Sequence, residues 1–222
     1  MLVKDCMTRH PAMISPQAPA AEAQEIMSEN KVRHLPVVGN GKKLVGLITR
    51  ECLAMKPDTL GSLNVWEISR YLSNLTVKDV MLKLSEVHTI EANRTVERAA
   101  RTLADYKIGC LPVLENGFVV GILSEVDLLR SYQEMLGLPT EGVRVTMRMP
   151  EKSKKKETGF ARLITAVSDQ DWGIMGIGSY PAPRRPGFWD VVLKIPNVTS
   201  AEVQEVLIQV EEQEIVDIRD VV

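Results

Sequence analysis

Two short apolar passages occur twice in this sequence, and together they decide the fold. The stretch Leu44-Val45-Gly46-Leu47-Ile48-Thr49 returns as Val119-Val120-Gly121-Ile122-Leu123-Ser124. Before it stands His34-Leu35-Pro36-Val37-Val38 in one copy and Cys110-Leu111-Pro112-Val113-Leu114 in the other. The segments that join the paired runs contain Asn40-Gly41 and Asn116-Gly117, and Asn-Gly between two apolar runs is a strong signal for a β-hairpin. The sequence therefore predicts two related hairpins.

The repetition extends beyond the hairpins. Val3-Lys4-Asp5-Cys6-Met7 returns as Val77-Lys78-Asp79-Val80-Met81, so three matched blocks occur in one order. Before each hairpin, apolar residues share one face of a predicted helix, at Ala20, Ala23 and Met27 in the first copy and at Val96, Ala99, Ala100 and Leu103 in the second. A second helix is expected after Thr49 and after Ser124. Each copy is thus predicted to be a β-α-β-β-α unit of the α/β (α+β) class.

A unit of this size is too small to bury a sufficient core alone, so we expect the two copies to pack as a pair. The predicted boundaries are residues 1–56 for the first repeat and 76–136 for the second. Residues 57–75 are predicted to contain a linker helix, because Val65, Trp66, Ile68 and Leu72 form an amphipathic pattern there.

The repeat does not recur after a second linker at residues 137–142. The apolar pattern of residues 143–222 instead predicts β-α-β-β-α-β, the ferredoxin-like order. Its first helix is expected to turn Phe160, Leu163, Ile164 and Val167 inward. Thr199-Ser200-Ala201-Glu202 is a capping-box signature before the second helix, which should bury Val203, Val206, Leu207 and Val210.

The repeated unit resembles a tandem pair of CBS domains, a Bateman module, over about residues 1–136. The C-terminal region resembles an ACT domain in the order of its elements, and Gly159 matches the glycine that often starts the first helix of that family. The whole arrangement is similar to acetoin-utilisation-type CBS–ACT proteins. The resemblance implies a regulatory, dimeric protein that binds AMP, ADP, ATP or S-adenosylmethionine between the repeats, with small amino acids as the ligands typical of ACT domains.

The sharpest candidate for ligand binding is the pair Ser124 and Asp127. A carboxylate can accept hydrogen bonds from both hydroxyls of a ribose, and a hydroxyl beside free N–H groups at a helix start can contact phosphate. The resemblance assigns these roles to the matching Thr/Ser-x-x-Asp motif. The same four residues also form a variant of the capping box, which stabilises a helix without any ligand.

The first repeat differs from the second at its candidate site. Thr49 keeps the hydroxyl, but Cys52 stands where the ribose acid is expected, so we predict at most one good nucleotide cleft, with Thr49 a possible phosphate contact. Arg33 and His34 precede the first strand of the hairpin, at a position that borders the cleft in the family. Arg33 is a candidate phosphate ligand, although a surface arginine and a hydrogen-bonded histidine would have the same sequence.

Composition restricts the class of protein. A formal net charge of −2 and a pI near 6.0 give no overall case for nucleic-acid binding. The apolar runs are too short for a membrane span, the first residues lack a signal-peptide pattern, and the three scattered cysteines are expected to be buried reduced thiols, so a cytoplasmic location is predicted. Neither a zinc-like ligand spacing nor a known catalytic motif is present, so no metal, cofactor or enzymatic activity is expected.

Two alternatives remain open. Both modules could serve only as a dimerisation scaffold that binds no small ligand, an interpretation that Cys52 favours. The lysine-rich run at residues 152–156 is either a solvated loop or a docking loop for an anionic ligand or partner.

Overall fold

The computed structural model describes residues 1–54, 75–138, 140–152 and 158–221. Within them the chain divides into two compact units, residues 1–128 and 129–222, and each is described by itself. The predicted linker helix at residues 57–75 lies almost wholly outside the described residues. No helix in the described ranges combines the length and the apolar character that crossing a membrane requires.

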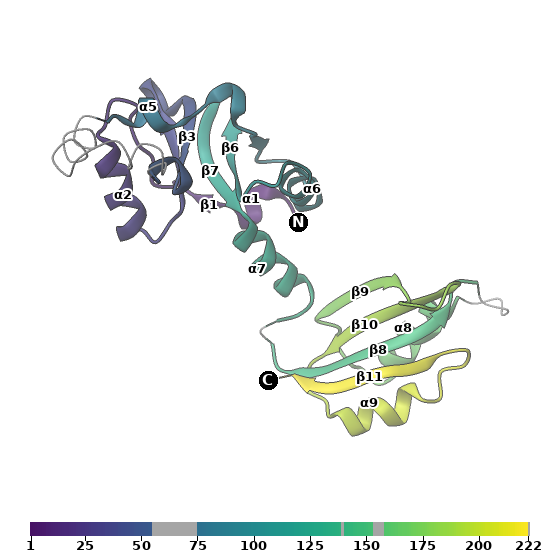
Figure 1. Cartoon of the computed structure of the whole chain (residues 1–222). Helices are drawn as coiled ribbons and strands as arrows, with labels where there is room; N and C mark the ends of the chain where they lie inside the picture. The colour runs from purple at the N-terminus through teal and green to yellow at the C-terminus, as the bar shows by residue number, and fades with distance from the viewer. Residues whose placement is uncertain (55–74, 139, 153–157, 222) are drawn as a thin grey trace. The chain divides into compact units, whose positions relative to one another are not determined.

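The first unit contains both repeats (Figure 1). The described elements of the first repeat are α1 (Val3–Cys6), β1 (Thr8–Arg9), α2 (Ala20–Glu29), β2 (His34–Val38), η1 (Asn40–Lys42), β3 (Leu44–Thr49) and η2 (Glu51–Leu53). The second repeat consists of α5 (Val77–Val80), β4 (Leu82–Lys83), η3 (Leu84–Glu86), β5 (Ile90–Glu91), α6 (Val96–Tyr106), β6 (Cys110–Glu115), β7 (Phe118–Ser124) and α7 (Glu125–Met135), which extends into the second unit.

The two repeats complete each other's sheets. One sheet has the order β2-β3-β4 and the other β1-β7-β6-β5, so β1 of the first repeat pairs with β7 of the second, and β4 of the second pairs with β3 of the first. A single repeat would lack one strand of its own sheet. The predicted packing of the copies as a pair is therefore built into the hydrogen bonding of the backbone.

The exchanged strands explain why the repeats share a glycine in the second hairpin strand, Gly46 or Gly121, and a methionine before the exchanged strand, Met7 or Met81. A Cβ atom at Gly121 would lie 2.5 Å from Met7 Sδ and 3.0 Å from the Thr8 carbonyl oxygen. At Gly46, a Cβ atom would lie 2.7 Å from Met81 Sδ and 2.5 Å from a carbonyl oxygen of β4. Real Cβ atoms essentially never come closer than 3.0 Å to another atom, and a 3.0 Å contact is itself tighter than most, so each glycine leaves the room that the exchanged strand occupies.

The predicted hairpins and helix faces are largely confirmed. Asn116 and Gly117 join β6 to β7 with φ of 52° and 83°, as the two-residue hairpin turn requires. In α2 and α6 the expected positions are buried, with one exception: Ala100 is exposed, because the buried face of α6 follows Val96, Ala99 and Leu103.

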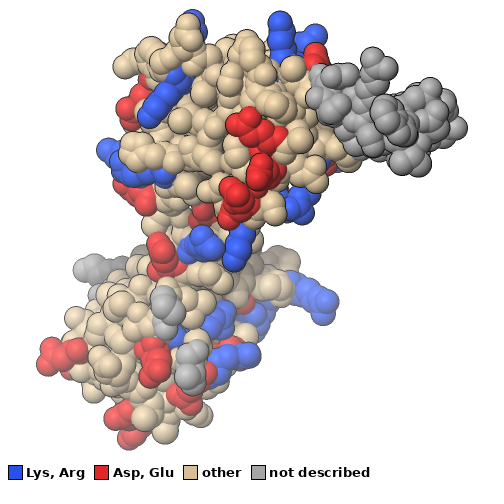
Figure 2. Space-filling model, turned by 90° about the vertical axis from the view of Figure 1, so that its left-hand side faces the viewer, with Lys and Arg blue, Asp and Glu red and all other residues tan. Residues whose placement is uncertain are grey.

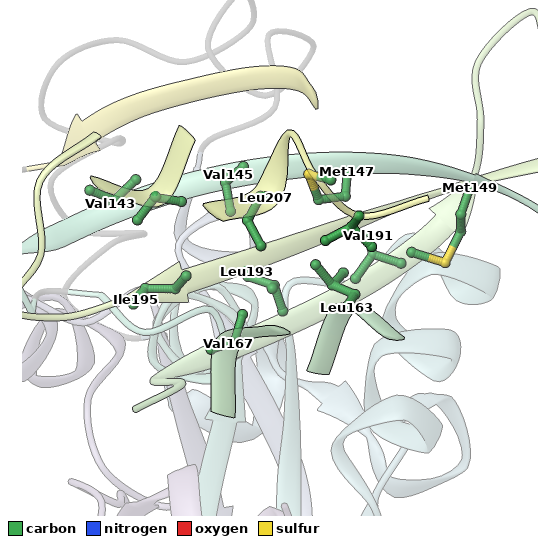
Figure 3. Close-up of a cluster of buried hydrophobic side chains, with 12 residues drawn as sticks. Val143, Val145, Met147, Met149, Leu163, Val167, Val191, Leu193, Ile195 and Leu207 are labelled. Carbon is green, nitrogen blue, oxygen red and sulfur yellow. The ribbon is translucent and has the colours of Figure 1, made fainter. Parts of the chain in front are cut away.

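The second unit has the predicted ferredoxin-like topology. Its elements are β8 (Gly142–Pro150), α8 (Gly159–Ser168), β9 (Gly176–Pro181), β10 (Phe188–Ile195), α9 (Ser200–Leu207) and β11 (Glu214–Val221). The strands form an antiparallel sheet in the order β11-β8-β10-β9. Alternate residues of β8 and β10 pack against both helices in one hydrophobic cluster, which includes Val145, Leu193, Leu163 and Leu207 (Figure 3).

Two details of this unit bear on the sequence predictions. Phe160 is 43% exposed, so it does not share the inward face of α8 with Leu163 and Val167. The capping box at the start of α9 is present: the Glu202 carboxylate accepts from the Thr199 N–H at 2.8 Å, and the Thr199 hydroxyl accepts from the Glu202 N–H at 3.4 Å. The similarity to ACT domains stays a prediction, because the topology alone does not distinguish that family.

Candidate functional site

A cavity of about 380 Å³ lies between the two repeats of the first unit. Its volume falls within the range typical of small-molecule sites. We call it the cleft. The first repeat contributes Arg33, His34, Leu47, Thr49 and Glu51, and the second contributes Leu82, Glu86, Val87, His88, Lys107, Ile108, Gly109, Cys110 and Glu125.

His34 lies where the repeats meet. It begins β2, opposite Thr49 in β3, and its imidazole packs against Gly109 of the second repeat. A Cβ atom at Gly109 would lie 3.2 Å from His34 Cε1, closer than most Cβ contacts, so the glycine leaves room for the ring. Burial is the main cause that lowers the pKa of His34, and the neighbouring Arg33 lowers it further, while Glu51 and Glu125 act in the opposite direction.

The two sides of the cleft are related by the repeat but differ in chemistry. The Arg50 N–H donates to the Arg33 carbonyl at 3.0 Å, and the Glu125 N–H donates to the Gly109 carbonyl at 3.2 Å, so Arg33 and Gly109 occupy equivalent positions. Only the first repeat places a guanidinium there. Together with Lys107, Arg33 supplies the fixed positive charge among residues that line the cleft.

The predicted hydroxyl Thr49 lies in the cleft. Its Oγ1 accepts from the Cys52 N–H at 3.4 Å and lies 3.4 Å from Cys52 Sγ. Hydrogen bonding to Thr49 is also the first cause that lowers the pKa of the Glu51 carboxyl. Thr49 therefore connects the end of β3 to the short helix η2 and faces the same cavity as Arg33 and His34.

Ser124 and Asp127 lie together at the start of α7 but are not among the residues that line the cleft. Asp127 Oδ2 accepts from the Ser124 N–H at 2.8 Å and from the Ser124 hydroxyl at 2.6 Å, and Ser124 Oγ accepts from the Asp127 N–H at 3.3 Å. These contacts form the capping box that the sequence also allowed. The structure thus brings Arg33, His34 and Thr49 together and holds Ser124 and Asp127 as a separate pair.

Sequence reasoning missed Glu51, Glu125, Lys107 and His88 in the cleft. Glu125 directly follows Ser124, and Glu51 stands two residues after Thr49. Neither acid occupies the Asp position of the Thr/Ser-x-x-Asp motif, so the motif did not point to them. Their position within two residues of Thr49 or Ser124 in the sequence was the signal that could have predicted Glu51 and Glu125. The lining also contains Glu86, so the cleft mixes acidic and basic side chains.

The cysteines and the potential metal-binding side chains give less support for a catalytic or metal site. Burial raises the pKa of the Cys110 thiol to about 12, so this thiol stays protonated near neutral pH. Cys6 and Cys52, expected to be buried, are only half-buried. Among the described residues, no three His, Cys, Asp or Glu side chains lie together as metal ligands would. Figure 2 shows basic and acidic side chains interspersed over the face that it draws.

Comparison with known proteins identifies the repeats. Residues 3–56 and 77–134, which make up half of the chain, match the family described as the CBS domain. The CBS domain-containing protein YhcV of Bacillus subtilis is 29% identical over 126 residues, which cover 57% of this chain and 81% of that protein. A protein named homoserine O-acetyltransferase from Methanococcus vannielii is 28% identical over 134 residues, but they cover only 24% of its length.

Solved structures similar to this chain have matching folds. A putative acetoin utilization protein, AcuB, from Vibrio cholerae has a TM-score of 0.52 and 28% identity, and the match covers 62% of this chain and 94% of that one. The Arabidopsis thaliana CBS-pair protein CBSX2, solved in complex with AMP, has a TM-score of 0.50 and 26% identity, with 59% and 95% covered.

Proposed function

Because the chain belongs to the CBS-domain family, we propose that it is a non-catalytic regulatory protein that binds an adenosyl nucleotide between its two repeats. AMP, ADP, ATP and S-adenosylmethionine are the ligands to compare. The observation that carries the proposal is the cleft, which takes side chains from both repeats and holds the Arg33 guanidinium at its wall. The AMP complex of CBSX2 supports AMP as the first nucleotide to test.

We propose that Arg33 binds the phosphate of the nucleotide. A guanidinium forms paired hydrogen bonds with phosphate oxygens, and its equivalent in the second repeat, Gly109, cannot do so. His34 and Thr49 lie close enough to the same space to contribute a ring contact and a hydroxyl. The side chains of Glu51, Glu86 and Glu125 repel phosphate, so the anion is expected at the Arg33 wall and the ribose or base nearer the acids.

The role of Ser124 and Asp127 stays a proposal of its own. For Asp127 to bind the ribose, the sugar hydroxyls would replace the Ser124 hydroxyl as donors to its carboxylate. The 2.6 Å contact between Ser124 Oγ and Asp127 Oδ2 is the bond that such binding would break. Loss of nucleotide binding on Asp127→Ala would support this role, because a cap that only starts α7 has no ligand to lose.

Coupling to a partner would follow from the position of the cleft. A ligand that contacts both repeats favours one arrangement of the two over another, and such a difference in affinity is what any regulatory response requires. We propose that the protein acts as a cytoplasmic homodimer, and that the C-terminal unit transmits the change or binds a second effector.

The second candidate function is a dimerisation scaffold without a small ligand. Cys52 stands where the Thr-x-x-Asp motif of the first repeat would have its acid, and the motif acid of the second repeat, Asp127, is already hydrogen bonded to Ser124. Neither motif therefore offers an uncommitted carboxylate to a ribose. This alternative and the sensor differ in one measurable property, which is nucleotide affinity.

Thermal unfolding with each nucleotide tests the proposal. At a hundred times its dissociation constant, a ligand adds about 2.7 kcal/mol to the free energy of unfolding, which raises the melting temperature by several degrees. We expect AMP to stabilise the wild-type protein and Arg33→Ala to weaken AMP about tenfold or more, because a charge-assisted hydrogen bond contributes about 1.5–3 kcal/mol. Isothermal titration calorimetry gives the affinities.

Arg101→Ala is the matched control, since Arg101 is an exposed arginine of α6 that does not line the cleft. It should bind AMP as the wild type does. Protein shown to be free of copurified nucleotide that gains no stability from any of the four ligands would refute the sensor and favour the scaffold. An equal loss in both variants would mean that AMP is attracted only by net charge.

A further inference from the structure

A second cavity, larger than the cleft, lies in the second repeat alone. It encloses about 990 Å³ between the edge strand β5, helix α6 and the turn that joins β6 to β7. We call it the α6 groove, after the helix labelled in Figure 1. The proposed nucleotide cleft does not account for it, because the two linings share only His88.

Two arginines give the α6 groove its charge. In the part of the chain that the structure describes, the Arg98 guanidinium has neither an ion pair nor a hydrogen bond. The backbone of Arg98 is engaged: its N–H donates to Thr95 Oγ1 at 3.3 Å, and its carbonyl accepts from the Thr102 hydroxyl at 2.9 Å. Arg94 pairs with Glu91 at 3.2 Å, but both side chains are more than 60% exposed. An exposed pair of this kind is weak, so an incoming anion can compete with Glu91 for Arg94.

An aromatic pair forms part of the same lining. The rings of His88 and Tyr106 stack with centroids 3.7 Å apart and an angle of 26° between their planes. Tyr106 remains 58% exposed, so much of its surface is accessible to another planar group. Tyr106 and Arg98 lie eight residues apart on α6, and Thr102, midway between them, also lines the groove, so the three follow one side of the helix.

The first repeat shows that the fold does not require these residues. Buried positions of α2 and α6 correspond at an offset of 76 residues (Ala20 with Val96, Ala23 with Ala99, Met27 with Leu103). The parallel bridges Ile14–Val37 and Ile90–Val113 have the same offset. At the positions equivalent to His88, Arg94, Arg98 and Tyr106, the first repeat has Ala12, Ala18, Glu22 and Asn30.

We propose that the α6 groove binds an aromatic organic anion, a phosphate monoester carried on a planar ring. The two guanidinium groups match the charge and geometry of a phosphate, and the ring of the ligand would stack on Tyr106. The remaining polar lining, which includes Thr102 and Asn116, can hydrogen bond substituents of the ring. The site is specific to the second repeat, because the first has an acid in place of Arg98.

Phenyl phosphate is the minimal probe, since it carries both the ring and the phosphate. Isothermal titration of the full chain would compare the wild type with Arg98→Glu and Tyr106→Asn, which introduce the residues of the first repeat. We expect Arg98→Glu to weaken phenyl phosphate at least tenfold and Tyr106→Asn several-fold. Inorganic phosphate should bind more weakly than phenyl phosphate to the wild type and should be insensitive to Tyr106→Asn.

Two controls separate this site from general charge attraction and from the cleft. Arg101→Glu makes the same charge change on the same helix at a residue outside the lining, and Arg33→Ala alters the cleft; both should keep the wild-type affinity within twofold. The proposal is wrong if millimolar phenyl phosphate does not bind the wild type, if Arg101→Glu weakens it as much as Arg98→Glu, or if only Arg33→Ala does. Melting temperatures of the variants establish that each is folded, and the result does not depend on whether AMP binds the cleft.

Discussion

Gly46 and Gly121 show how a single residue controls the pairing of the repeats. Each stands in the strand that receives an exchanged strand, β4 or β1, and each faces a methionine sulfur and a backbone carbonyl. The carbonyl at Gly46 is too close for any Cβ atom, and the carbonyl at Gly121 would be 3.0 Å from one, a contact tighter than most. The flexible methionine can move away, but the carbonyl oxygens belong to the hydrogen-bonded strand. The two glycines are therefore required by close approach, not by an unusual backbone conformation.

We predict that Gly121→Ala destabilises the first unit by about 1–3 kcal/mol, the range for overpacking a well-packed contact. The added methyl group would push Met7 and the Thr8 carbonyl away from β7 and weaken the exchange of β1. Urea unfolding of the full chain, followed by circular dichroism, measures the change. Gly39→Ala is the control, because its Cβ would lie at an ordinary 3.4 Å from a Val45 methyl group, and equal stabilities of the two variants would contradict the argument.

At the scale of the element, the same capping motif begins helices in both units. Thr199 with Glu202 caps α9, and Ser124 with Asp127 occupies the same geometry at the start of α7. A motif that satisfies the free N–H groups of a helix needs no ligand to be retained. This is why the Ser124–Asp127 motif alone does not decide between a cap and a nucleotide site.

We predict that Thr199→Ala lowers the free energy of unfolding of the second unit by about 1 kcal/mol, as expected for loss of an N-cap hydroxyl. The Glu202 N–H would lose its acceptor, and the Glu202 carboxylate would lose the Thr199 hydroxyl as a donor. Thr199→Ser keeps the hydroxyl and should restore most of the stability. A serine variant as unstable as the alanine variant would show that the methyl group of Thr199, and not the cap, is what matters.

At the scale of the whole molecule, the two units differ in whether their hydrophobic cores can be separated into smaller independent parts. The core of the second unit lies wholly within residues 143–218, and its buried side chains come mostly from β8, β10, α8 and α9, as the labelled residues in Figure 3 show. The first unit has two hydrophobic clusters, and both draw residues from each repeat: Val3 and Met7 pack with the second repeat, and Val77 and Met81 pack with the first. The repeats are therefore interlocked, whereas the second unit has a core of its own.

We predict that residues 129–222 fold alone with a cooperative thermal transition, and that residues 1–56 do not. The isolated first repeat would lack β4 and Val77, and its own β1 and Val3 would have no sheet to join. Near-ultraviolet circular dichroism and amide NMR spectra of the two fragments test this. A well-dispersed spectrum from residues 1–56 would contradict the strand exchange as a requirement for folding.

Much of the fold could be predicted because it depends on local patterns. Asn116-Gly117 specifies a hairpin turn, Thr199-Ser200-Ala201-Glu202 specifies a helix start, and the apolar alternation from Val143 to Met149 specifies the core face of β8. The prediction that Ala100 and Phe160 face the core is wrong. Each directly follows a buried residue, Ala99 or Gly159, and helical periodicity alone discriminates poorly between adjacent positions at the edge of a buried face. Of the residues predicted for the candidate site, Arg33, His34 and Thr49 line the cleft, and the ligand roles of all five, Ser124 and Asp127 included, stay predictions.

What the sequence determined by itself was the existence of two repeats, the ferredoxin-like order after them and the difference between Thr49-x-x-Cys52 and Ser124-x-x-Asp127. Only the tertiary structure decided which strand completes which sheet, which residues share the cleft and that Arg98 and Tyr106 share a groove. The physical reason is the range of the interactions. Periodicity and capping act over a few residues. The cleft instead brings together Arg33 and Lys107, which are more than seventy residues apart, and no local pattern in a single sequence indicates a contact over that separation.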